Sequence, residues 1–212
     1  MTRPVVVVGA GGFGREALDV LAAMVRAGSD LQLVGVVDDS PSEDALARLT
    51  RRGAPYLGPL DEWLSTRPEA GCVLAVGAPQ SRGRLVARLA VTGVEPVTLL
   101  HPSAVIGEQV RIGPGAVLCA GVQVSTEAVL GAWCHLNSGS IVGHDTVLGD
   151  FVSVNPGAIL SGSVHVGDGV LVGAGAVILQ GLSLGAWSTV GAAACVTRDV
   201  PEAVVVKGVP AR

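Results

Sequence analysis

Aromatic residues are scarce in this 212-residue chain, which has two Phe, one Tyr and three Trp. That scarcity fits a narrow core of aliphatic side chains. No uninterrupted apolar run approaches the roughly 18 residues of a membrane-spanning helix, so no membrane span is expected. The chain reaches a glycine loop after the four valines Val5–Val8, an apolar run too short for a signal peptide. A cytoplasmic protein is therefore expected.

Cysteine and charge are also sparse. The four cysteines, Cys72, Cys119, Cys134 and Cys195, form no C-x-x-C pair and predict reduced, mostly packed thiols. Charged residues make up 15% of the sequence, and the net charge of −4 argues against nucleic acid as a partner.

A strict six-residue repeat dominates the second half of the chain. Every sixth residue from Ile106 to Val196 is Ile, Leu or Val, without one insertion. Neither a helical nor a flat-strand period explains such spacing, which is typical of a parallel β-helix. Three six-residue sides make an 18-residue coil, so residues 18 apart stack about 4.8 Å from each other. The residue four positions after each aliphatic one is small or β-branched, except Leu182, and is expected to face inward.

Columns of residues 18 apart sort the three corners of the predicted prism. One corner carries a glycine in every coil, which suggests a turn with positive φ: Gly113, Gly131, Gly149, Gly167 and Gly185. The same corner stacks Trp133 on Phe151, with Trp187 two coils further. This apolar strip is interpreted as buried against a neighbouring subunit, with base stacking as the less favoured alternative.

A second corner is nearly bare, from Ala120-Gly121 through Ala174-Gly175 to Ala192-Ala193. It could receive a long thin ligand, or it could simply turn tightly. The third corner carries His144-Asp145, with Gly162 one coil away from the histidine. A histidine beside a carboxylate and a glycine N–H could supply the base, orienting anion and oxyanion donor of acyl transfer. An inert surface histidine is the alternative.

The first hundred residues alternate strands with helices, which predicts a parallel α/β sheet. The predicted strands are Val5–Val8, Leu31–Val37, Cys72–Val76 and Val94–Leu99, and the predicted helices are Arg15–Ala27, Ser42–Arg52 and Ser81–Ala90. The dipeptide His101-Pro102 marks a boundary between a Rossmann-like domain, 1–100, and a β-helix with a C-terminal tail, 101–212. His101 itself is expected to be structural.

A glycine motif follows the first strand: Gly9-x-Gly11-x-x-Gly14, with Asp38 further on. Such glycines let phosphates approach a helix N-terminus, while the acidic residue holds a ribose or base. A tight turn without a ligand is the alternative. Only one mononucleotide-binding half and a little more fits in this domain, which favours one nucleotide-linked ligand over a complete NAD.

Four segments together resemble a known family: V-V-V-G-A-G-G-F-G-R-E, V-V-D-D, the G-H-D of the prism, and the closing G-V-P-A-R. The chain resembles bacterial sugar acyltransferases of the sialic acid O-acetyltransferase type, including nucleotide-amino-sugar N-acetyltransferases. The resemblance implies a left-handed β-helix, a homotrimer, acetyl-CoA bound between adjacent prisms, and a nucleotide-linked amino sugar in surface-glycan biosynthesis. It implies no metal.

The resemblance also implies roles for single residues. His144 would be the general base, Asp145 would raise its basicity, and the N–H of Gly162 would bind the thioester oxygen. The implied acetyl-CoA contacts are Ser153, Gly162, Ala174 and Ala192. The implied sugar-nucleotide contacts are Gly11, Gly12, Phe13, Asp38, Asp39 and Gly77. Some relatives carry histidine where Ser153 or Phe13 stands here.

Other functions remain open at this point. They are O-acetylation of a sugar hydroxyl, a non-catalytic scaffold that binds a sugar nucleotide, and an NAD oxidoreductase, although no second catalytic domain accompanies the glycine motif. A β-helix carbonic anhydrase would bind zinc through three histidines. His135, His144 and His165 lack the required H-x₄-H spacing, and His144 does not share a column with the other two.

Overall fold

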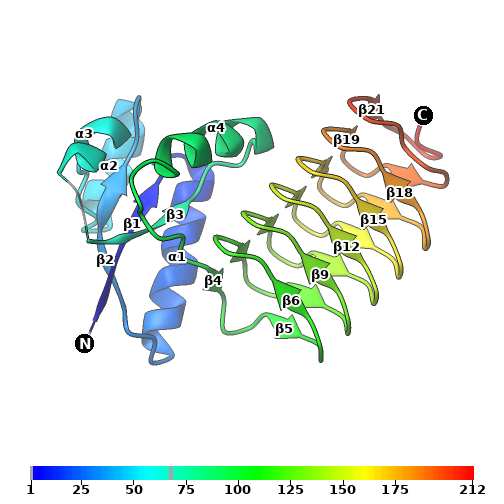
Figure 1. Ribbon diagram of the computed structural model, residues 1–212, viewed down its shortest axis with the longest axis horizontal. Helices are drawn as coiled ribbons and strands as arrows, with labels where there is room; N and C mark the ends of the chain where they lie inside the picture. Colours follow the sequence, from blue (N-terminus) through cyan, green and yellow to red (C-terminus); the bar gives the residue numbers. More distant parts are fainter. Residues whose placement is uncertain (1, 67–68) are drawn as a thin grey trace.

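The computed structural model describes residues 2–66 and 69–212. An α/β domain is followed by a three-sided parallel β-helix, as predicted (Figure 1). The α/β sheet has three parallel strands in the order β2-β1-β3: β1 (Arg3–Val8), β2 (Leu31–Val37) and β3 (Gly71–Leu74). Val5, Val6 and Val7 of β1 are fully buried at the centre of this sheet.

The helices that accompany the sheet in the described residues are α1 (Gly12–Arg26), α2 (Glu43–Arg51), α3 (Leu60–Ser65) and α4 (Pro79–Leu89). The three predicted helices are confirmed within three residues at each end, whereas α3 was not predicted. Helix α2 begins where the Ser42 hydroxyl accepts a hydrogen bond from the N–H of Ala45, at 3.2 Å, a frequent N-terminal cap. Among the described residues, no helix combines the length and apolar composition needed to cross a bilayer.

The predicted strand Val94–Leu99 is wrong as a single element. Pro96 forms only an isolated bridge with Cys72. Three residues later the chain has already entered the β-helix, because β4 (Leu99–Leu100) pairs with a strand of the first β-helix coil. The N–H of Cys72 donates to the carbonyl of Glu95, and the carbonyl of Cys72 accepts from the N–H of Val97. This segment therefore adds one bridge at the edge of the α/β sheet, where proline is tolerated.

The β-helix has three faces, named here in the order in which the chain meets them. The first face contains β4, β7 (Val117–Leu118), β10 (His135–Leu136), β13 (Ser153–Val154), β16 (Leu171–Val172), β19 (Thr189–Val190) and β21 (Val205–Val206). The second contains β5 (Val105–Ile106), β8 (Gln123–Val124), β11 (Ile141–Val142), β14 (Ile159–Leu160), β17 (Val177–Ile178) and β20 (Cys195–Val196). The third contains β6 (Arg111–Ile112), β9 (Val129–Leu130), β12 (Val147–Leu148), β15 (His165–Val166) and β18 (Ser183–Leu184).

Strands 18 residues apart are paired throughout, for example His135 with Ser153, as the repeat predicted. The repeat residues from Leu118 to Val196 are at most 4% exposed, which confirms the inward column. At the C-terminal end, the N–H of Ala211 donates to the carbonyl of Cys195 at 2.8 Å, so the tail folds back onto β20. Three of the four cysteines are buried thiols, as expected: Cys72, Cys119 and Cys134.

The predicted role of the corner glycines is wrong. Gly113, Gly131 and their column are absent from the positions with positive φ, which lie two residues later and include Trp133 at 58° and Phe151 at 61°. The glycines are needed for another reason. A Cβ on Gly131 would lie 2.5 Å from the carbonyl carbon of Gly149, so glycine lets successive coils approach.

The apolar strip at this corner is covered by the same chain, not by a neighbouring subunit. Trp133 is 8% exposed and packs in one cluster with Val8, Trp63 and Leu74 of the α/β domain, with Phe151 at its edge. Trp187, two coils beyond Phe151, lies outside this contact and is 37% exposed. The α/β domain therefore covers the corner between the third and first faces.

Candidate functional site

His144 and Asp145 form a close pair in the turn between β11 and β12, at the corner between the second and third faces. The Nδ1 atom of His144 lies 2.6 Å from Oδ2 of Asp145, and the histidine side chain is 61% exposed. The backbone of the pair is held from both sides: the N–H of Asp145 donates to Thr126 at 3.2 Å, and the carbonyl of His144 accepts from Ser163 at 2.7 Å. A proton on Nδ1 leaves the Nε2 lone pair free to act as a base.

Gly162 lies directly against this histidine. A Cβ on Gly162 would overlap the Nε2 atom of His144, so only glycine lets the ring occupy its present place. Within the described residues, the N–H of Gly162 donates to no group of the chain. The structure therefore brings a potential base, its carboxylate partner and an unused N–H donor together. No group of three or more metal-ligating side chains is found in the described part of the chain.

The bare corner lies between the first and second faces. Ala174 and Ala192 are both exposed there, and the next residue in each coil, Gly175 or Ala193, has positive φ. A smooth edge runs along several coils, but it is a different corner of the prism from that of His144. One chain thus separates the two predicted parts of the acetyl-transfer site.

The predicted sugar-nucleotide residues follow the parallel strands β1, β2 and β3 and so lie toward the carboxyl edge of the α/β sheet. Of these residues, Asp38 and Asp39 line the cavity at that edge. A cavity of about 170 Å³ lies there, lined by Val8, Gly9, Asp38, Asp39, Ser40, Leu60, Val76 and Leu85. Gly11 and Gly12 face open space where a Cβ would stand. A Cβ on Gly14, in contrast, would overlap the carbonyl oxygen of Gly9. The third glycine of the motif therefore serves helix packing, and the second leaves room for a ligand.

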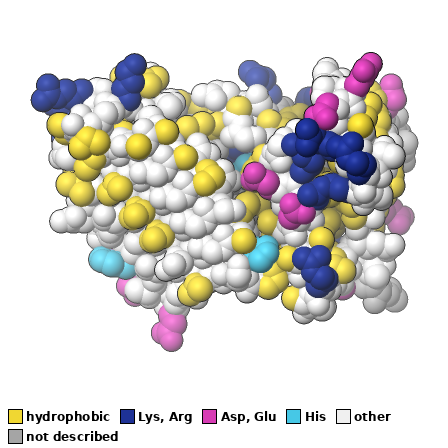
Figure 2. Space-filling model, turned by 180° about the vertical axis from the view of Figure 1, so that it is seen from behind, with side chains coloured by type: hydrophobic (Ala, Val, Ile, Leu, Met, Phe, Trp, Pro, Cys, Tyr) yellow, Lys and Arg dark blue, Asp and Glu magenta, His cyan; other side chains and the backbone are white. Residues whose placement is uncertain are grey.

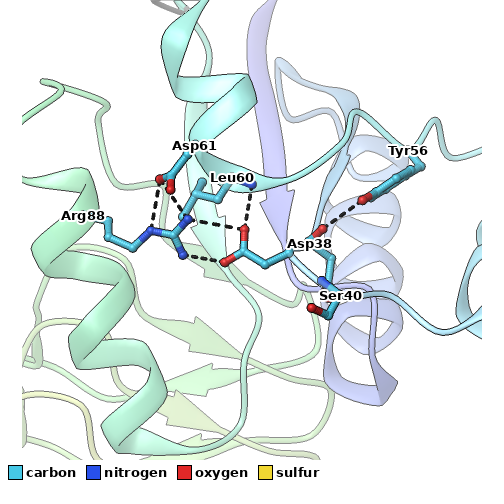
Figure 3. A network of polar contacts seen from close by, with 7 residues as sticks. Asp38, Ser40, Tyr56, Leu60, Asp61 and Arg88 are labelled. Atoms are coloured by element: carbon cyan, nitrogen blue, oxygen red, sulfur yellow. Dashed lines mark hydrogen bonds and ion pairs between the residues drawn. The ribbon is translucent and has the colours of Figure 1, made fainter.

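Asp38 and Asp39 are held by the protein itself. Asp38 accepts from the N–H of Ala10 at 2.7 Å and thereby fixes the glycine loop, while its carbonyl accepts from Tyr56 at 2.9 Å. Asp39 is 2.5 Å from Arg88, which also pairs with Asp61 at 2.8 Å (Figure 3). The hydrogen bond from Arg88 lowers the pKa of the Asp39 carboxyl. The carboxylate of Asp39 is therefore ionised and held in a fixed position beside the cavity.

Phe13 and Ser153 both lie where the two domains meet. The ring of Phe13, next to the glycine loop, is 4.5 Å from the ring of His135 on β10. Ser153 is 2% exposed, and its hydroxyl donates to the carbonyl of Gly77 at 3.1 Å and accepts from Arg82 at 2.9 Å. The structure does not place Ser153 beside the exposed Ala174 and Ala192.

The roles of two residues at this junction were not predicted from the sequence. His135 is 1% exposed, and both of its ring nitrogens lack a hydrogen-bond partner among the described residues. Arg82 is fully buried. Nothing in the sequence distinguishes Arg82 from Arg84 or Arg88 of the same helix. The repeat places His135 at an outward position of a strand, but it does not show that the α/β domain covers this position.

Comparisons with known proteins match both domains of the chain. The PglD N-terminal domain matches residues 4–89, and the bacterial transferase hexapeptide (six repeats) matches residues 145–180. A solved mutant of perosamine N-acetyltransferase from Caulobacter crescentus, in complex with CoA and GDP-perosamine, superposes with a TM-score of 0.88 at 31% identity. The superposition covers 99% of this chain and 95% of that one.

The chain belongs to the hexapeptide-repeat nucleotide-amino-sugar N-acetyltransferases. GDP-perosamine N-acetyltransferase of Escherichia coli O157:H7 is 34% identical over 138 residues, covering 62% of this chain and 58% of that protein. UDP-N-acetylbacillosamine N-acetyltransferase of Bacillus subtilis (strain 168) is 36% identical over 118 residues, covering 56% and 52%. The matched part of the chain thus spans little more than half the length of these two N-acetyltransferases.

Proposed function

We propose that the protein is an acetyl-CoA-dependent N-acetyltransferase that acts on a nucleotide-linked amino sugar in surface-glycan biosynthesis. The observation that carries the proposal is the juxtaposition of His144, Asp145 and Gly162, with the base and an unused N–H donor side by side. The similarity to a perosamine N-acetyltransferase bound to CoA and GDP-perosamine supports both substrates. Acetyl-CoA as the acetyl donor is consistent with a cytoplasmic enzyme.

The chemistry follows from these three residues. The neutral amine of the sugar attacks the thioester carbonyl, and the resulting oxyanion accepts a hydrogen bond from the N–H of Gly162. Nε2 of His144 removes a proton from the attacking nitrogen, while Asp145 stabilises the imidazolium. The carbon–sulfur bond then breaks, an amide remains on the sugar, and CoA leaves as its thiol after taking up the proton.

A homotrimer with sites between protomers would unite the separated parts. The α/β domain covers the first face and its corner with the third face, and His144 lies at the corner of the same prism that is opposite the first face. The second face, between the bare corner and the His144 corner, presents the half-buried Ile141 and Val177 and the 36% exposed Ile159 outward. If three second faces meet at a threefold axis, the bare corner of each prism adjoins the His144 corner of its neighbour.

Thiol release from acetyl-CoA tests the function directly. The purified protein would be assayed with UDP-, GDP- and CMP-linked amino sugars and with their hydroxyl counterparts. Turnover with an amino sugar nucleotide is expected, together with an acetamido product by mass spectrometry. Turnover only with hydroxyl acceptors would assign O-acetylation instead, and acetyl-CoA binding without turnover would contradict the proposal.

A further inference from the structure

Arg82, in the first turn of α4, joins the α/β domain to the β-helix. Its side chain is 0% exposed. All five guanidinium N–H groups have an acceptor: the carbonyls of Trp133 (3.1 Å), Val76 (3.0 Å), Gly77 (2.8 Å) and Phe151 (2.5 Å), and the Ser153 hydroxyl (2.9 Å). No carboxylate of the described residues forms an ion pair with it. Because a buried charge is costly unless its donors are all used, this arrangement leaves little freedom to either domain.

The β-helix side of the contact consists of the same corner in two successive coils. Trp133 and Phe151 are 18 residues apart, and both have positive φ. At the equivalent position Trp187, beyond the domain contact, the carbonyl has no partner in the described residues and the residue is open to solvent. Where the α/β domain excludes water from this corner, Arg82 takes the place of water on two buried carbonyls.

The other side of the contact is the loop after β3. Val76 lines the cavity at the carboxyl edge of the sheet. The carbonyl of Gly77 is held twice, by Arg82 and by the Ser153 hydroxyl at 3.1 Å. The last sheet-type bond of this strand is the one from the N–H of Ala75 to Val8, at 2.8 Å. Beyond Ala75, the position of the loop is therefore determined by Arg82 and the β-helix.

We propose that Arg82 is a positioning residue for the sugar nucleotide. It fixes the β3 side of the nucleotide cavity against the β-helix, so that a bound sugar is held at a set distance from the prism. It touches no reacting atom. The proposal rests on the proposed function in one respect, namely that the ligand of the cavity is a nucleotide-linked sugar.

Two substitutions in the full chain test this role: Arg82→Lys, which keeps the charge but not the planar five-donor fork, and Arg82→Met, which removes both. The matched control is Arg84→Met, because Arg84 is exposed on the same helix and donates, within the described part of the chain, only to the Ser81 hydroxyl. The dissociation constants of GDP, UDP and CoA would be measured by calorimetry, and thermal unfolding by circular dichroism.

Both Arg82 variants are expected to weaken nucleoside diphosphate binding at least about tenfold. The reason is that the loop of Val76 and Gly77 loses one or two of the charged hydrogen bonds that hold it beside the cavity. Binding of CoA should change less than about twofold, since three of its four implied contacts, Gly162, Ala174 and Ala192, lie on other corners, and Arg84→Met should change neither. Unchanged diphosphate affinity, or an equal loss for both ligands, would overturn the positioning role. If neither Arg82 variant folds, Ser153→Ala provides the test, with an expected weakening of about threefold.

A wild-type protein that binds neither GDP nor UDP would contradict the nucleotide cavity, but it would leave Arg82 testable. Hydrogen exchange at the amides of Ala75 and Trp133, both hydrogen-bonded, is then the readout. Arg82→Lys should accelerate exchange there at least about tenfold relative to Arg84→Met. Equal rates in the two variants would show that Arg82 does not hold the loop.

Discussion

The Oδ2 atom of Asp145 lies 2.6 Å from Nδ1 of His144, on the side of the ring away from Gly162. A carboxylate at this place favours the tautomer that carries its proton on Nδ1 and exposes the Nε2 lone pair. Asp145 has a positive φ of 58°, and Glu127 and Ser163 at the same turn position of the neighbouring coils also have positive φ. The carboxylate of Asp145 orients the base without having to touch the substrate.

His144→Ala should lower kcat/KM at least about a hundredfold, because general-base catalysis contributes roughly 10²–10⁴ in rate. The assembly should stay intact, since the side chain is largely exposed. Thiol release and size-exclusion chromatography are the measurements. His165→Ala, an exposed histidine on the third face, is the control and should keep full activity. Near-wild-type turnover of His144→Ala would refute the base assignment.

Gly162→Ala should lower kcat/KM at least about tenfold. The added methyl group keeps the backbone N–H but needs the space of the His144 ring, so the base must move. The control is Gly83→Ala, because a Cβ on Gly83 in α4 would meet no atom of the described residues beyond the neighbouring backbone of its own helix. Full activity of Gly162→Ala would mean that the ring position is unimportant.

Ala174→Phe should raise the KM for acetyl-CoA at least about tenfold, because a bulky ring would interrupt the smooth corner proposed to receive the cofactor. The KM for the sugar nucleotide should stay the same. Ala186→Phe, at the corner between the third and first faces, is the matched control. Equal effects of both substitutions on acetyl-CoA would argue that the cofactor does not use the bare corner.

Acid should destabilise the protein through His135. Burial, assisted by the charge of Arg82, lowers the pKa of His135 well below 6.5, so the folded state keeps it neutral while the unfolded chain takes up a proton below that pH. The stabilising contribution is complete above about pH 6.5 and falls by about 1.4 kcal/mol per pH unit as the pH decreases below it.

Chemical denaturation at one protein concentration, between about pH 5 and pH 7.5, measures this slope. His135→Leu should remove the contribution of His135 to the dependence of the unfolding free energy on pH. His165→Gln, a change at an exposed histidine, should leave that dependence unchanged. A slope that persists in His135→Leu would assign the acid sensitivity to other groups.

The sequence predicted most where periodic patterns determine structure. Sixteen aliphatic residues at one spacing determine which side chains point inward, so the coil length and the register of Leu118 to Val196 were predictable. The corner glycines were misread because a repeated glycine indicates either positive φ or close approach, and only the distance from Gly131 to Gly149 decides between them.

Contacts between the two domains could not be predicted from the aliphatic repeat or from the repeated glycines. The burial of Trp133 by its own chain, the five acceptors of Arg82 and the pairing of Ser153 with Gly77 all depend on where the α/β domain rests. No local propensity encodes that position. The His144–Asp145 pair was accessible to sequence reasoning because both partners are adjacent in the chain and neighbour Gly162 at one coil's distance.

Because every coil has 18 residues, the β-helix keeps its register only when its length changes by whole coils. Removing or adding a whole coil would change the length of the β-helix by about 4.8 Å and would keep every column of residues on its own corner. A change of six residues would rotate all later columns to the next corner, and would separate Gly162 from His144 if it fell between them. Between these two residues no coil can be gained, because one added coil would place Gly162 about 9.6 Å from His144 instead of beside it.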